Sequence, residues 1–222
     1  MDDKPKQQVQ VNGLFQTPVL ITVLPDAETL NAALQTTILD HEKSHPSTQH
    51  SNLGGWQSDT EFLTWGGAAA QTLLGHTRTL ADRLTADREG RPVKVEWHAN
   101  AWANVNRETQ GNEFHTHAGC FWSAVYYVAD GGIGSDPSLG GALEFADPRG
   151  VAPAMHAPLL SYNFPGGQSA GASEAISPQA GLLIIFPSFV SHAVKPYLGK
   201  QVRISIAINF SATPTLKPLP LG

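Results

Sequence analysis

The second half of the chain is a succession of short β-type segments, and this pattern limits the possible folds more than any other feature. Residues 93–106 alternate between small apolar and polar side chains, whereas residues 181–187 and 201–210 are apolar and rich in β-branched residues. Most of the 21 glycines and 16 prolines lie in this half, where they suit turns between strands. The pattern predicts about eight short strands in an antiparallel sandwich or barrel-like core.

The first 90 residues differ in character. Residues 14–24 predict a first strand, and residues 26–45 predict a helix with Asp26 as its capping residue. An apolar stripe in residues 60–87 predicts a second helical region, weakened at Gly66 and Gly67, and residues 47–58 read as a loop. We therefore expect one domain, 1–222, of the α+β class (mainly β), with a strand and helices in 1–90 supporting a core in 91–212.

Composition restricts the partners and the compartment. The net charge is −5, with 14 basic and 19 acidic residues and no run of lysine or arginine, so nucleic-acid binding is disfavoured. A single cysteine, Cys120, excludes an internal disulfide and suits a reducing compartment. The polar start of the chain and the lack of a long apolar run predict neither a secretory signal nor a membrane span, hence a cytoplasmic protein. Edge strands leave room for a homodimer.

His115 and His117 are candidate metal ligands. Residues 113–128 read as a strand, and residues two apart on a strand share a face, so both imidazoles could bind one cation. A site needs at least one more ligand, and His192 follows a buried strand and a turn that would bring it to a strand end. The three histidines are therefore the predicted metal and catalytic residues.

Arg203 stands among apolar, β-branched neighbours. A buried arginine is costly unless an anion compensates it, and Ser205 lies on the same face of the strand. Together the two side chains could hold one carboxylate. Asn104 and Asn106 lie on the polar face of residues 93–106, which is either a polar pocket wall or an edge facing water.

Taken together, these segments resemble the 2-oxoglutarate/Fe(II)-dependent oxygenases, and more narrowly a bacterial and phage group of such oxygenases with no assigned substrate. The matching stretches lie between residues 97 and 210 and include 115–117, 123–128, 140–149, 181–188, His192 and 203–205. The resemblance implies a double-stranded β-helix (jelly-roll, cupin-like) core with Fe(II) at its mouth and 2-oxoglutarate as cosubstrate. It also implies that Tyr126 contacts 2-oxoglutarate and that Asn104 lines the cosubstrate wall.

The activity implied is an O2-dependent dioxygenase that hydroxylates a small-molecule or peptide substrate while 2-oxoglutarate is decarboxylated to succinate. The sequence departs from the superfamily at His117, where a carboxylate is usual. Glu144 or Asp147 could supply that carboxylate instead. The same residues are compatible with a cupin-type dioxygenase that needs no keto-acid, a three-histidine zinc hydrolase, or a non-catalytic jelly-roll binding protein. The Gly-, Ser- and Pro-rich residues 151–178 predict a lid or binding loop.

Overall fold

The computed structural model describes residues 10–150 and 173–212, together with Met155, Ala157, Leu159, Leu160 and Tyr162. The predicted lid spans residues 151–178, and apart from these five residues its part within 151–172 lies outside the described residues. The final stretch of that segment, 173–176, forms a strand, so the prediction of a loop was wrong there.

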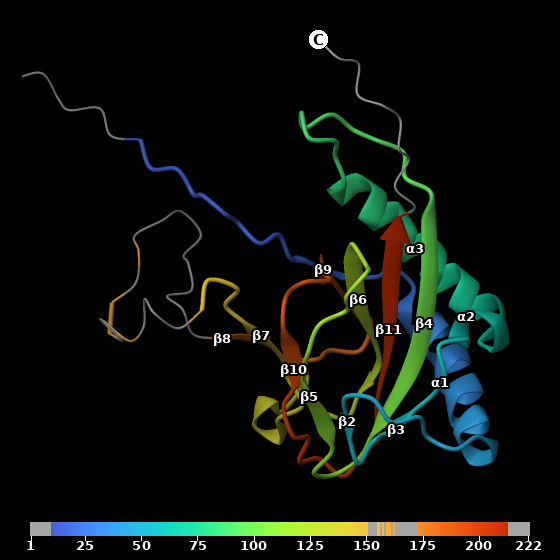
Figure 1. Ribbon diagram of the computed structural model, residues 1–222. Coiled ribbons are helices and arrows are strands. Elements are labelled where there is room, and N and C mark those ends of the chain that lie inside the picture. The colour runs from blue at the N-terminus through green and yellow to red at the C-terminus, as the bar shows by residue number, and fades with distance from the viewer. Residues whose placement is uncertain are drawn as a thin grey trace, which may run out of the picture.

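Two antiparallel sheets face each other across the core (Figure 1). The six-stranded sheet has the order β1-β9-β6-β11-β4-β3, where the strands are β1 (Leu20–Val23), β3 (Trp56–Gln57), β4 (Trp97–Asn106), β6 (Trp122–Asp130), β9 (Leu182–Pro187) and β11 (Arg203–Ala212). The five-stranded sheet has the order β2-β5-β10-β7-β8, with β2 (Asn52–Leu53), β5 (Gly111–His115), β7 (Leu143–Ala146), β8 (Ser173–Ile176) and β10 (His192–Val194). A short 3-10 helix, η1 (Pro137–Leu139), precedes β7.

The helices α1 (Ala27–Ser44), α2 (Phe62–Trp65) and α3 (Gly67–Leu84) cover the outer face of the six-stranded sheet (Figure 1). Side chains alternate between the two faces of a strand. Both faces of this sheet are buried, because the helices cover one and the five-stranded sheet covers the other. Its outer face packs against helix residues such as Leu34, Ile38 and Leu73. Its inner face forms a second apolar cluster with the five-stranded sheet, which includes Phe145 and Phe186. The predicted class, mainly β with helices packed on one side, is confirmed.

Three local expectations differ from the structure. Residues 47–58, expected to be a loop, contain β2 and β3, which pair with β5 and β4. Asp26 does not cap α1 with its side chain, because its backbone is left-handed (φ 55°) rather than extended as in a capping residue. The predicted weakness at Gly66 and Gly67 is a break between α2 and α3, where Gly67 takes a φ of 67°. Neither 18-residue helix in the described part of the chain is apolar enough to lie across a lipid bilayer.

Candidate metal and cosubstrate site

The structure brings His115, His117 and His192 together. One potential ligand atom from each histidine lies within 4.8 Å of the other two. His115 ends β5 and His192 begins β10, and the two residues are directly opposite each other in the sheet. The predicted strand over 113–128 was wrong in one respect: it is interrupted after His115, so His117 reaches the cluster through a turn. The backbone N–H of His117 donates to the Ser188 carbonyl at 3.1 Å, which holds this turn against the end of β9.

Hydrogen bonds fix which ring nitrogens can bind a metal. His115 Nδ1 lies 2.7 Å from the Glu113 carbonyl oxygen, and His192 Nδ1 lies 2.9 Å from that of Val190. A carbonyl only accepts, so each Nδ1 carries a proton and Nε2 is the ring nitrogen left to bind a metal. Burial lowers the pKa of His117 to about 4 and that of His192 to about 3, and the neighbouring histidines add to both shifts. Both rings are therefore neutral at pH 7, which is the form that binds a metal.

Aromatic side chains pack beside His117 and His192. The His192 ring packs against Phe186, with centroids 4.8 Å apart, and Trp102 lies 5.4 Å from His117. These rings limit the rotation of the imidazoles and keep water from the buried side of the cluster. The set of oriented nitrogen donors fits a divalent transition metal.

Neither Glu144 nor Asp147 joins the cluster. Glu144 bonds to the Ser173 hydroxyl and lies 3.3 Å from Lys195 Nζ, and Asp147 forms an ion pair with Arg149 at 2.6 Å. Among the described residues, the group that could hold a metal consists of the three histidines.

Arg203 is fully buried beside Tyr127 of the apolar cluster between the two sheets, and no described carboxylate pairs with it. Its Nη1 donates to Asn106 Oδ1 at 3.0 Å and to Ser205 Oγ at 3.4 Å, whereas its Nε and Nη2 have no partner. The Tyr127 hydroxyl beside it is also buried and unpartnered. Burial lowers the pKa of Arg203 and raises that of Tyr127. Unpartnered buried donors around one cation fit the carboxylate of a ligand such as 2-oxoglutarate.

Near Arg203 the asparagine row is buried and is not a water-facing edge. Asn104 and Asn106 are buried and lie opposite Ser205 and Arg203 in the pairing of β4 with β11. Asn104 Oδ1 has no partner, and a half-turn of the amide would present its donors to the same space. Gln57, opposite Asn104 on β3, is likewise buried with an unpartnered oxygen. Sequence reasoning missed Gln57, because nothing in a polar segment indicates that it becomes a strand inside the core.

The structure places Tyr126, the predicted cosubstrate contact, away from Arg203. Tyr126 points to the helix side of the sheet, where its hydroxyl donates to Asn31 Oδ1 of α1 at 2.7 Å. Tyr127 faces the interior and lies beside Arg203. Alternation requires the two tyrosines to face opposite sides, but only the register of β6 against β11, with its shift between Ile204 and Ser205, decides which one faces inward.

One family model and several solved structures are similar to this chain. The family model described as "Putative 2OG-Fe(II) oxygenase" matches residues 100–209, a span that contains the three histidines and Arg203. No curated protein sequence matches the chain.

Three solved structures share the fold. A prolyl-4-hydroxylase from Pseudomonas putida is 19% identical with a TM-score of 0.60, covering 90% of this chain and 95% of its own. A prolyl hydroxylase from Trichoplax adhaerens, in complex with a peptide fragment of the hypoxia inducible factor oxygen degradation domain, is 15% identical with a TM-score of 0.60 over 87% and 83% of the two chains. A viral collagen prolyl hydroxylase from Paramecium Bursaria Chlorella virus-1, in complex with 2OG, is 11% identical with a TM-score of 0.56 over 88% and 96%.

These neighbours support the predicted double-stranded β-helix core, to which the two facing sheets correspond. The match of the family model and the three-histidine cluster agree with the resemblance read from the sequence. The chain belongs to the 2-oxoglutarate/Fe(II)-dependent oxygenase superfamily.

Proposed function

We propose that His115, His117 and His192 hold Fe(II), and that Arg203, Ser205, Tyr127 and Asn104 bind 2-oxoglutarate. The observation that carries this proposal is the fully buried Arg203, with two free donors beside the unpartnered Tyr127 hydroxyl, together with three converging imidazoles. Tyr127 and Phe186, which pack beside Arg203 and His192, belong to the same apolar cluster between the sheets. A three-histidine zinc hydrolase would use the imidazoles but leave this cation without an anion.

When bound, Fe(II) and 2-oxoglutarate supply the oxidative chemistry that hydroxylates a C–H bond and leaves succinate. The chain's own residues orient the cosubstrate and shield the site from water. Arg203 Nε and Nη2 and the Tyr127 hydroxyl donate to the distal carboxylate of 2-oxoglutarate, and Ser205 and Asn106 hold the guanidinium in place. Phe186 and Trp102 exclude water beside the histidines.

The third histidine changes the electrostatics of the site. Three neutral imidazoles leave the full +2 charge of the metal, whereas a carboxylate at position 117 would reduce it to +1. One carboxylate of a dianionic cosubstrate therefore offsets part of this +2 charge, and the other offsets the positive charge of Arg203. We expect 2-oxoglutarate and Fe(II) to bind with strong mutual dependence.

Metal titration and product analysis together test the function. Wild-type protein should take up one Fe(II) per chain and release succinate from 2-oxoglutarate, whereas His115→Ala and His192→Ala should lose both properties. His76→Ala, at an exposed position on α3, is the matched control and should behave as wild type. Unchanged iron content in both ligand variants would refute the metal site.

The reacting partners are O2 and a substrate that carries the C–H bond. A cytoplasmic location is proposed because a single cysteine permits no disulfide within the chain. A homodimer stays a prediction.

A further inference from the structure

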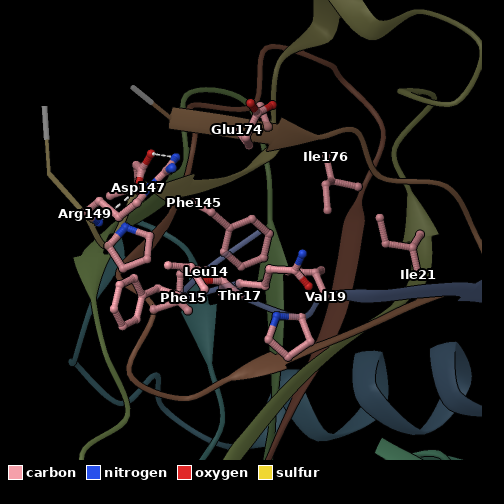
Figure 2. Close-up of a pocket in the computed structure, with 16 residues that line it drawn as sticks. Leu14, Phe15, Thr17, Val19, Ile21, Phe145, Asp147, Arg149, Glu174 and Ile176 are labelled. Atoms are coloured by element: carbon pink, nitrogen blue, oxygen red, sulfur yellow. Dashed lines mark hydrogen bonds and ion pairs between the residues drawn. The ribbon is translucent and has the colours of Figure 1, made fainter. Parts of the chain in front are cut away.

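A cleft of about 540 Å³ opens between the segment before β1 and the β7–β8 pair. Its lining is mostly apolar and includes Leu14, Phe15, Val19, Ile21, Phe145 and Ile176. Figure 2 shows Phe145 near the centre, the segment with Leu14, Phe15 and Val19 on one side, and Glu174 and Ile176 on the other. The volume lies within the range typical of small-molecule sites.

The cleft borders the five-stranded sheet, which carries His115 and His192. His192 pairs with His115 on one side and with Phe145 on the other, and Phe145 pairs with Glu174. Residues directly opposite in antiparallel strands point to the same face, so these four form one row across the inner side of the sheet. The Phe145 ring lies 6.2 Å from that of His192, and Val190, which accepts the His192 hydrogen bond, also lines the cleft.

Apolar side chains around the cleft are exposed to solvent. Ile21 faces inward opposite Ile184, yet it is 52% exposed because β1 and β8 are the outer strands of their sheets and do not pair with each other. Phe15 is 90% exposed and has a φ of 59°, a conformation that is unfavourable for a bulky residue. Exposed apolar groups around one hollow are typical of a ligand site.

The charge at the cleft is net negative. Asp147 and Arg149 form an ion pair, so their charges cancel. Glu174 is exposed on the rim, and neither a hydrogen bond nor an ion pair joins it to another residue in the described part of the chain. One carboxylate is therefore free to meet a cation.

We propose that this cleft is the substrate subsite of the oxygenase and that it takes a small apolar amine. The apolar body packs against Phe145, Ile21 and Val19, and the ammonium group meets Glu174. This inference rests on the proposed function only for the reaction: the row from Glu174 to His192 would place the amine's hydrocarbon part beside the metal site.

Calorimetry with three matched probes tests the chemistry of the cleft. We expect 4-phenylbutylamine to bind the full chain about three- to fivefold more tightly than 4-phenylbutan-1-ol, and 4-phenylbutanoate to bind most weakly. Glu174→Gln should remove the preference for the amine, while Glu108→Gln, at another exposed position, should keep it. Ile21→Asn should weaken all three probes by about tenfold, because an apolar contact is lost.

Val23→Asn is the control for Ile21→Asn, since Val23 lies on the same face of β1, is 49% exposed and does not line the cleft. Equal binding of the three probes, equal effects of the two asparagine variants, or selective binding of an extended lysine-containing peptide in place of the amine would overturn the proposal. Succinate release from 2-oxoglutarate is measured separately. If it occurs without the probe pattern, the cleft proposal alone fails; if the probe pattern occurs without succinate release, the amine site stands and the oxygenase function fails.

Discussion

The guanidinium carbon of Arg203 lies 5.2 Å from the centroid of the Tyr127 ring, and both side chains are fully buried. A cation–π contact of this kind offsets part of the cost of burying the charge. It does so without using Nε and Nη2, which stay free to donate. Arg203 and Tyr127 therefore keep unused hydrogen-bond donors that could bind an anion.

Arg203→Met should separate stability from function. Replacing a buried charge that has no counter-ion by an apolar side chain should stabilise the ligand-free protein, by about 1–4 kcal/mol, and should abolish 2-oxoglutarate binding. Thermal unfolding with and without 2-oxoglutarate measures both effects. The cosubstrate should raise the melting temperature of the wild type and leave that of the variant unchanged. A variant that is still stabilised by 2-oxoglutarate would show that the anion binds elsewhere.

The two adjacent tyrosines form a matched pair of substitutions. Tyr127→Phe should weaken 2-oxoglutarate binding by about tenfold or more, because a hydrogen bond to a charged group is lost. Tyr126→Phe should leave that binding unchanged and lower the free energy of unfolding by about 1 kcal/mol, because its hydroxyl bonds to Asn31. Titration calorimetry and urea unfolding give the two quantities. The reverse pattern would restore Tyr126 as the cosubstrate residue.

Substitutions at position 117 test the charge argument. His117→Ala should reduce Fe(II) affinity by about tenfold or more, as loss of a direct ligand should cost at least as much as loss of its supporting contact. His117→Asp should retain one metal per chain and bind it without 2-oxoglutarate more readily than the wild type does, because the carboxylate supplies the missing negative charge. Metal titration in the presence and absence of 2-oxoglutarate distinguishes the alanine variant from the aspartate variant. Equal metal affinity of the alanine variant and the wild type would exclude His117 as a ligand.

The metal-free protein should lose stability in mild acid through His192. Its folded pKa of about 3 lies below the ordinary value of 6.5, so between these values the unfolded chain binds the extra proton. The contribution is fully present above pH 6.5 and is lost as the pH falls, by roughly 2 kcal/mol at pH 5. Urea unfolding at pH 7 and pH 5 measures it. His192→Gln should make the dependence shallower without removing it, because the pKa of His117 is also lowered, to about 4. His76→Gln should leave the dependence unchanged.

Gly141 and Gly150 distinguish a steric clash from backbone strain. Both have positive φ, 67° and 81°, so alanine should cost about 1–2 kcal/mol at each. At Gly141 the added Cβ would also lie 2.8 Å from Ile133 Cδ1 and 3.3 Å from Arg203 Nε, whereas at Gly150 nothing lies within 4 Å. Gly141→Ala should therefore be the more destabilising change and should weaken 2-oxoglutarate binding. Equal unfolding energies with unchanged binding would mean that Arg203 adjusts freely.

Much of the candidate site could be predicted from the sequence because its chemistry depends on residue type. Three histidines in two segments and an arginine among β-branched residues are costly or unusual unless they meet a ligand, and this holds whatever the exact fold. The alternation of residues 93–106 likewise placed Asn104 and Asn106 on one face.

Other features depended on contacts between segments far apart in the chain. Which of Tyr126 and Tyr127 faces Arg203 follows from the register of β6 against β11. Gln57 and the cleft beside Phe145 exist only because residues from the first 60 positions join both sheets. Local sequence determines the type and face periodicity of an element, because these follow from backbone geometry. Only tertiary packing decides which face meets which neighbour, because the energy of burial is set by the partner.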